Sequence, residues 1–279
     1  MDRQRFPVSG GVTLTADVGG PPNAVPVIFM HGGGQTRGAW RGATRLLVDN
    51  GYHVISLDLR GHGESDWAPD ANYSLDANVA DLKAVCATLN SPPALVGASL
   101  GGVTALLGVG AGVQARALVL VDIVPQVNPE GVGKIGAFMN ANPDGFASVD
   151  EAADAVAAYM PHRPRPRDTS GLKRNLREGP DGRLYWHWDP KFMSARGVAG
   201  ADDMSSRMTL AARTVRIPTL LVRGAQSDVV DTEGVANFRS LIPAAEYVDV
   251  EGAGHMVAGD KNDAFNSAIL EFLGRAIPR

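Results

Sequence analysis

The chain has 279 residues, a formal net charge of -4 and a sequence pI of about 5.9. This length can bury a large core, and a composition of 44% hydrophobic and 20% charged residues excludes a disordered or collagen-like chain. The slightly acidic balance gives no broad positive field, so neither nucleic acid nor a membrane surface is expected as a partner. A small molecule is the expected partner, and the sequence leaves open whether the chain is a monomer or a homodimer.

The N-terminus and the single cysteine bear on location and redox state. Residues 1–8 are polar and lack the apolar stretch of a secretory signal, and no apolar run reaches the ~18 residues that a membrane span needs. Both features predict a cytoplasmic protein. Cys86 lies in a helical-looking stretch and is expected to be a buried small hydrophobe without an internal disulfide partner.

Strand-length apolar runs alternate with helical segments, which predicts an α/β fold with a mostly parallel central sheet flanked by helices. The first strand-like run, residues 12–17, precedes a Gly-Gly-Pro-Pro turn and is expected to pair antiparallel at an edge. The later expected strands are residues 25–30, 53–57, 94–96, 117–121, 219–222 and 245–250. Apolar spacing predicts helices at residues 75–89, 100–111 and 260–275.

The pattern changes between residues 125 and 213. Strand-like runs vanish there, and prolines, charged residues and aromatic residues increase. We interpret residues 125–213 as a helical cap inserted after the sixth strand, so that residues 1–124 and 214–279 form one core domain.

A candidate nucleophile follows the expected strand at residues 94–96. Gly97-Ala98-Ser99-Leu100-Gly101 places Ser99 between a strand and a helix, which is the context that a Gly-x-Ser-x-Gly elbow requires. A sharp turn of this kind pushes the serine hydroxyl into a cleft, and the flanking glycines let strand and helix pass closely. We therefore expect Ser99 to be a catalytic nucleophile.

A serine hydroxyl needs a base to accept its proton. His255, in a Gly-Ala-Gly-His turn after the last strand-like run, lies where a loop reaches the carboxyl edge of the sheet and is the expected base. His31 and His62 lie in loops at the same edge, and we expect His31 to shape its loop. His187 lies in the cap, where contact with solvent or ligand is the expectation.

Two aspartates are candidates for the acid that orients the histidine. Asp228 lies one loop past a strand and precedes His255, which gives the chain order serine, acid, histidine. Asp122 ends the strand-like run next to the serine elbow and is the alternative. We favour Asp228 and expect Asp122 to bind loop backbone.

The glycines after the strand at residues 25–30 offer backbone donors. His31-Gly32-Gly33-Gly34 has no side chains that would block a substrate oxygen. An N–H group of this loop, paired with that of Leu100, could form an oxyanion hole. We assign Gly33 and Leu100 to it, although the sequence does not decide between Gly32 and Gly33.

The loop at residues 31–34, the Asp-Leu-Arg-Gly-His-Gly-Glu-Ser segment at 58–65, the serine elbow, Asp228 and Gly254-His255 together resemble the α/β-hydrolase superfamily. The resemblance covers nearly the whole chain. Within the superfamily the sequence is similar to the serine esterase and lactonase branch, which also holds the so-called non-haem peroxidases. Related epoxide hydrolases and haloalkane dehalogenases need an aspartate at the elbow, so Ser99 counts against both chemistries.

The resemblance and the expected site imply a carboxylesterase that acts on small, hydrophobic esters through an acyl-enzyme. A lactonase for enol-lactones or acyl-homoserine lactones, or a C–C bond hydrolase, is the alternative on the same residues, and a non-catalytic ligand receptor is a third reading. No cofactor and no metal ion are implied, because no metal-ligand spacing or phosphate-binding glycine loop occurs. Candidate substrate-pocket residues are Gly34, Phe138, Trp186, Trp188 and Met256. Other apolar cap residues are also candidates, namely Met139, Phe146, Tyr159, Met160 and Met193, and each of the cap residues could equally build the core of the cap.

Overall fold

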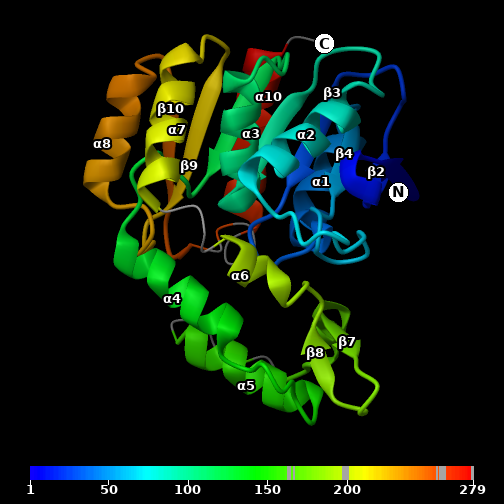
Figure 1. The fold of residues 1–279 in the computed structure, drawn as a ribbon. Coiled ribbons are helices and arrows are strands. Elements are labelled where there is room, and N and C mark those ends of the chain that lie inside the picture. The colour runs from blue at the N-terminus through cyan, green and yellow to red at the C-terminus, as the bar shows by residue number, and fades with distance from the viewer. Residues whose placement is uncertain (162–164, 166, 197–200, 256, 258–261, 278–279) are drawn as a thin grey trace.

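The structure is a computed structural model that describes residues 1–161, 165, 167–196, 201–255, 257 and 262–277. Helices surround a central sheet, and the segment after the sixth strand extends away from it at the bottom of Figure 1. Met256, one of the expected pocket residues, lies outside the described residues.

The central sheet has eight strands in the order β1-β2-β4-β3-β5-β6-β9-β10. The pairs β1–β2 and β2–β4 are antiparallel and the other pairs are parallel, which confirms the mostly parallel sheet with an antiparallel edge. The strands are β1 (Asp2–Pro7), β2 (Thr13–Gly19), β3 (Pro26–Met30), β4 (His53–Leu57), β5 (Ala94–Ala98), β6 (Ala117–Val121), β9 (Thr219–Gly224) and β10 (Glu246–Val250).

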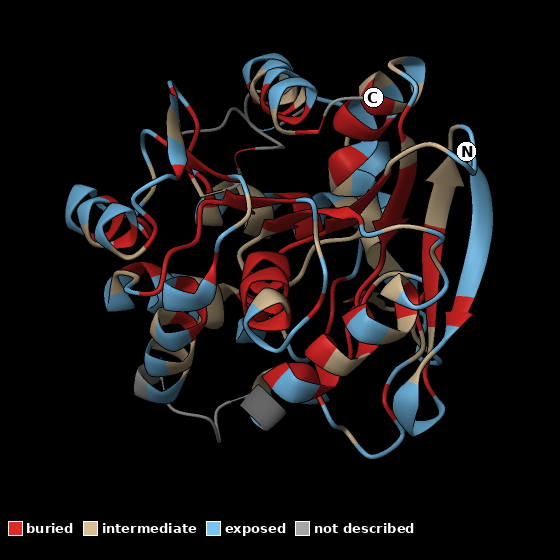
Figure 2. Ribbon diagram, turned by 90° about the horizontal axis from the view of Figure 1, so that it is seen from above, coloured by how far each residue is buried: buried red, intermediate tan, exposed pale blue. Residues whose placement is uncertain are grey.

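The first strand, β1, was not expected from the sequence. Its residues are polar or charged except Phe6 and Pro7, and only Phe6 is buried. Figure 2 shows this outer strand as almost entirely exposed. The strand forms because β2 offers a free edge, and an edge strand needs little apolar surface.

Alternation of side chains along the strands builds two apolar cores, one on each face of the sheet. In β3, Ile28 and Met30 join one core, whereas Val27 and Phe29 join the other. Residues from α2, α3, α7 and α8 complete the first core, and residues from α1 and α10 complete the second. These helices are α1 (Arg41–Asp49), α2 (Leu75–Cys86), α3 (Leu100–Gly110), α7 (Ala201–Thr214), α8 (Thr232–Leu241) and α10 (Asn262–Ala276), with short 3-10 turns at η1 (Ser9–Gly11) and η2 (Arg37–Trp40).

The inserted segment, called the cap from here on, comprises residues 125–196. It contains α4 (Pro129–Asn140), α5 (Val149–Tyr159), η3 (Ser170–Asn175), β7 (Leu176–Glu178), β8 (Leu184–Trp186) and α6 (Lys191–Arg196). Two features differ from the expectation. The strands β7 and β8 form a hairpin that is too short to give a strand pattern, and α7, expected within the cap, packs against α3 of the core.

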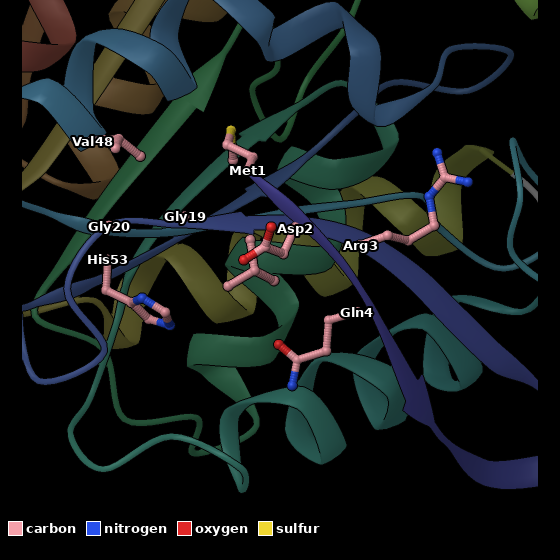
Figure 3. Close-up of a pocket in the computed structure, with 9 residues that line it drawn as sticks. Met1, Asp2, Arg3, Gln4, Gly19, Gly20, Val48 and His53 are labelled. Carbon is pink, nitrogen blue, oxygen red and sulfur yellow. The ribbon is translucent and has the colours of Figure 1, made fainter.

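A cavity of about 470 Å³ lies at the β1 edge of the sheet (Figure 3). It is lined by the start of β1, the end of β2 and His53, the first residue of β4. None of the expected site residues lines this cavity. His53 lies at the amino end of the parallel strands, whereas Ser99 follows the carboxyl end of β5. The candidate active site therefore lies at the opposite end of these strands from His53.

Candidate active site

Ser99 occupies a strained turn between β5 and α3. Its backbone has φ 45° and ψ -113°, in a region that residues with side chains rarely adopt. A Cβ atom on Gly97 would lie 2.3 Å from the carbonyl oxygen of Gly101, and one on Gly101 would lie 2.2 Å from that of Met30. Both glycines are therefore required for the helix to start directly against the sheet. The half-buried Ser99 is presented at the head of α3, as the elbow motif predicts.

His255, which follows β10, contacts Asp122. Its Nδ1 lies 2.6 Å from Oδ2 of Asp122, and because a carboxylate only accepts, Nδ1–H is the donor. Asp122 directly follows β6 and is fully buried. The strand β6 lies beside β5, and the Ser99 N–H donates to the Val121 carbonyl at 3.2 Å. The aspartate and the serine therefore leave adjacent strands at the same edge.

The Asp122 carboxylate has further donors from the last residue of β9 and from the loop that follows it. Its Oδ1 accepts from the Gly224 N–H at 3.0 Å, and its Oδ2 lies 2.5 Å from Ser227 Oγ. Ser227 Oγ also accepts from the N–H groups of Val229 and Val230, both at 3.1 Å. Because the two amides occupy the acceptor sites of Ser227 Oγ, and because a carboxylate only accepts, Ser227 donates its hydroxyl proton to Asp122.

The expectation that Asp228 would orient His255 is wrong in this structure. Asp228 lies four residues beyond the end of β9, and its half-exposed carboxylate binds Lys134 Nζ of α4 at 2.9 Å. Both aspartates lie between Ser99 and His255 in sequence, so chain order did not distinguish them. The signal that favoured Asp122 was its place immediately after a buried strand next to the elbow, with no loop to carry it away.

The loop after β3 lies against Ser99, since a Cβ atom on Gly32 would be 3.4 Å from Ser99 Cβ. The Gly32 N–H donates to Gln35 Oε1 at 2.9 Å, and the Gly34 N–H donates to His62 Nε2 at 3.1 Å. Among the described residues, no acceptor binds the Gly33 N–H. Of the three glycines, Gly33 therefore keeps a donor for a ligand.

The amide of Leu100 is the other expected oxyanion donor. Leu100 is the first residue of α3, and the first N–H groups of a helix have no partner within it. The partial positive charge at a helix N-terminus favours an anionic oxygen there. The Leu100 amide, at the N-terminus of α3 and directly after Ser99, therefore stays the expected second donor.

Three buried histidines hold the loops around this site. His31 Nε2 accepts from the Leu59 N–H at 3.0 Å, so Nδ1–H donates to the Gly32 carbonyl at 2.7 Å. His62 and His187 follow in a row, with ring centroids 5.1 Å and 5.9 Å apart along it. The expected contact of His187 with solvent or ligand is not what the structure shows, because this residue is buried and bound to backbone groups of the core.

Burial keeps two of these histidines neutral. Loss of hydration lowers the pKa of His31 to about 3, against a smaller opposing effect of the Gly32 carbonyl. Burial likewise lowers the pKa of His187 to about 3, with the neighbouring His62 acting in the same direction. Neutral imidazoles can each accept one hydrogen bond and donate one, which is the pattern that both residues show.

A loss of stability in acid is expected from these low pKa values. In the unfolded chain both histidines titrate near 6.5, so between there and pH 3 the unfolded state binds more protons than the folded state. Stability is therefore full above about pH 6.5 and falls by up to about 1.4 kcal/mol per pH unit for each histidine as the pH decreases.

Urea unfolding at several pH values measures this effect, with His187→Gln as the non-titrating control. From about pH 6.5 to about pH 4.5, the free energy of unfolding of the wild type should fall by about 2 to 3 kcal/mol more than that of His187→Gln. An identical pH dependence in the two proteins would contradict the assignment of a neutral, buried His187.

Apolar cap residues lie against the glycine loop. A Cβ atom on Gly34 would lie 3.3 Å from the Trp188 ring and 3.4 Å from Met139 Cε, and one on Gly33 would lie 3.7 Å from the Phe192 ring. Gly34, Trp188 and Met139 are among the pocket residues expected from the sequence, whereas Phe192 was not expected there.

The other expected pocket residues continue from Trp188 into the cap. Trp186 stacks on Trp188 with ring centroids 5.1 Å apart, and Phe138 lies 5.6 Å from Trp186 and stacks on Tyr159. Both tryptophans are buried within the core that also contains α2 and α3. Trp186 and Phe138 therefore build the cap's own packing, whereas Trp188 reaches the loop beside Ser99.

The sheet order, the strained serine turn and the insertion after β6 define the class of α/β-hydrolase-fold proteins. The model of the alpha/beta hydrolase family matches residues 27–268, and the chain belongs to this family. No helix in the described part of the chain has both the length and the apolar character to cross a membrane.

Relatives and solved structures agree with this assignment. Esterase Rv0045c of Mycobacterium tuberculosis is 32% identical over 251 residues, which cover 86% of this chain and 79% of that protein. The 2-hydroxy-6-oxo-6-(2'-aminophenyl)hexa-2,4-dienoic acid hydrolase of Metapseudomonas resinovorans is 27% identical and covers 98% of this chain and 91% of its own length. The crystal structure of E-2-(acetamidomethylene)succinate hydrolase superposes with a TM-score of 0.85 at 25% identity over 98% of both chains. These similarities support hydrolase activity on a small molecule.

Proposed function

We propose that the protein is a serine carboxylesterase that cleaves small, hydrophobic esters through an acyl-enzyme. The observation that carries the proposal is the 2.6 Å pairing of His255 with the buried Asp122 beside the strained turn of Ser99. In this mechanism His255 accepts the Ser99 proton as the hydroxyl attacks the ester carbonyl. The alcohol then leaves with that proton, and His255 activates water to release the acid and regenerate Ser99.

Each other group has a role that its position supports. Asp122 holds the His255 ring in one tautomer and stabilises the imidazolium that forms during attack. The N–H groups of Gly33 and Leu100 stabilise the oxyanion of the tetrahedral intermediate. Trp188, Met139 and Phe192, which lie against Gly33 and Gly34, offer the acyl group an apolar surface.

The test is trapping of the acyl-enzyme together with a substrate panel. The purified protein is treated with a fluorophosphonate and analysed by intact mass and peptide mapping, and p-nitrophenyl acetate, butyrate and octanoate are offered as substrates. We expect one adduct, located on Ser99, and ester turnover that falls for the longest chain. An adduct on another residue, or ester turnover that survives complete labelling, would overturn the proposal.

A second candidate reaction is cleavage of a C–C bond on the same residues. The relative from Metapseudomonas resinovorans carries a name that describes such a hydrolase. A protein that labels on Ser99 but hydrolyses β-diketones or lactones in preference to the p-nitrophenyl esters would favour the C–C hydrolase or lactonase assignment. Labelling of Ser99 without turnover of any of these classes would favour a ligand receptor.

A further inference from the structure

The peptide groups of Gly34 are held from two sides. Its N–H donates to Nε2 of His62, which belongs to the core, at 3.1 Å. Its carbonyl lies 3.2 Å from Nε2 of His187, which belongs to the cap. The loop that offers the Gly33 N–H to a ligand therefore depends on one residue from each part of the molecule.

The partners of His187 fix its tautomer. Its Nδ1 accepts from the Gly63 N–H at 2.8 Å, so Nδ1 carries no proton in the neutral ring. The proton is on Nε2, and Nε2–H donates to the Gly34 carbonyl. His187 thus joins the loop after β3 to the loop at residues 58–65, and it can make both bonds only in this orientation.

Gly34 controls the shape of the loop. The Gln35 N–H donates to the Gly32 carbonyl at 3.1 Å and closes a four-residue turn. Gly34 is the third residue of this turn and has φ 75°. Because glycine adopts many other backbone conformations at little cost, this φ value is not fixed by the residue itself. Hydrogen bonds on both sides of Gly34 prevent that change and so keep the Gly33 N–H in one direction.

The cap segment that carries His187 is fastened to the core. The Asp189 N–H donates to the Gly61 carbonyl at 2.9 Å, and the Asp189 carboxylate accepts from the Tyr73 hydroxyl. His187 and Asp189 are both buried. Residues 187–189 of the cap are therefore held against the core loops that surround the candidate active site.

We propose that His187 is a positioning residue for the oxyanion hole, so that the cap completes the catalytic apparatus as well as covering it. The proposal rests on the proposed function, because it assigns His187 to the support of the Gly33 donor. It acts through Gly34 and does not touch the substrate. Loss of the Gly34 bond should therefore weaken stabilisation of the tetrahedral intermediate more than binding of the ester.

A pair of amide substitutions separates the two bonds of His187. The His187→Asn side chain ends near the position of Nδ1 and can still serve Gly63, but it is too short to reach the Gly34 carbonyl. The His187→Gln side chain extends to the position of Nε2 and can still donate to Gly34. Arg177→Ala is the matched control, because Arg177 donates to the Gly63 carbonyl at 2.5 Å and covers Trp67, a cap-to-core contact that does not involve Gly34.

Steady-state kinetics with p-nitrophenyl butyrate and inhibition by a phenylboronic acid, which forms a tetrahedral adduct on serine, provide the readouts. We expect His187→Asn to lower kcat by about 10- to 100-fold, somewhat less than complete removal of an oxyanion donor, with KM nearly unchanged. Boronic acid affinity should fall in parallel. His187→Gln and Arg177→Ala should each stay within about 5-fold of the wild type.

Two outcomes would overturn the inference. Equal kinetics for His187→Asn, His187→Gln and Arg177→Ala, with thermal stability recorded for each, would reduce His187 to a general cap contact. A rise in KM at unchanged kcat in His187→Asn would make it a binding residue. Failure of the proposed function is distinct from both, because the wild type itself would then neither label on Ser99 nor hydrolyse the ester.

Discussion

Replacement of Ser99 by alanine is expected to lower kcat for p-nitrophenyl butyrate by about 10⁶-fold, since loss of the nucleophile removes the acyl-enzyme route altogether. The Gly33 and Leu100 donors would remain, so a residual rate of about 10³-fold above the uncatalysed reaction is expected. The thermal stability should be nearly unchanged, because alanine lacks only the hydroxyl and keeps the Cβ atom and the backbone hydrogen bonds of the turn. Initial-rate assays measure the loss of kcat, and thermal unfolding measures the stability of the variant.

The control for this result is the labelling reaction. Ser99→Ala should take up no fluorophosphonate under conditions that label the wild type completely. If Ser99→Ala retained the wild-type rate, the esterase activity would have another nucleophile or a contaminating source, and the elbow would be a structural turn only.

Substitution of the two candidate acids should give opposite results. Asp122→Asn is expected to lower kcat by about 10⁴-fold, because asparagine favours the wrong tautomer of His255 and cannot stabilise its charged form. Asp228→Asn should change kcat by less than about 3-fold, because it removes only an exposed ion pair with Lys134, and solvent screening makes such pairs weak. The pair is measured at one pH with saturating ester.

The reverse result would restore the acid that the sequence favoured. A large loss in Asp228→Asn with little change in Asp122→Asn would mean that the loop after β9 rearranges during turnover and brings Asp228 to His255. A large loss in both would point to a role of the Lys134 ion pair in holding the cap, and thermal unfolding of Asp228→Asn would then show a matching decrease.

Regular elements of the fold could be predicted where apolar pattern and burial coincide. The strands at residues 53–57 and 117–121 have the predicted bounds, because they are buried runs flanked by turns. The charged strand β1 and the three-residue strands β7 and β8 could not be predicted, since pairing partners rather than their own pattern make them strands. The end of the cap was misplaced because an amphipathic helix such as α7 gives no sign of which surface it covers.

In the site, too, residues set by the local sequence could be predicted, whereas residues set by contacts with distant parts of the chain could not. The positions of Ser99 and His255 follow from turns that the local sequence encodes with glycine. The choice of Asp122, by contrast, depends on the length of the loop that carries Asp228 away. The choice of Gly33 depends on Gln35 and His62 taking the neighbouring amides, and only the folded chain brings these acceptors to the loop.

The contacts of Asp122, which directly follows β6, divide the segment from Gly224 to Asp228 into two parts that substitutions can address separately. Gly224 and Ser227 bind the buried carboxylate of Asp122, so these two positions are constrained. Asp228 has only the cap lysine as its ion partner among the described residues, and its side chain is half exposed. A new residue at position 228 could therefore retune how firmly α4 is attached, and with it the entry of bulky esters, while the charge behind His255 stays in place.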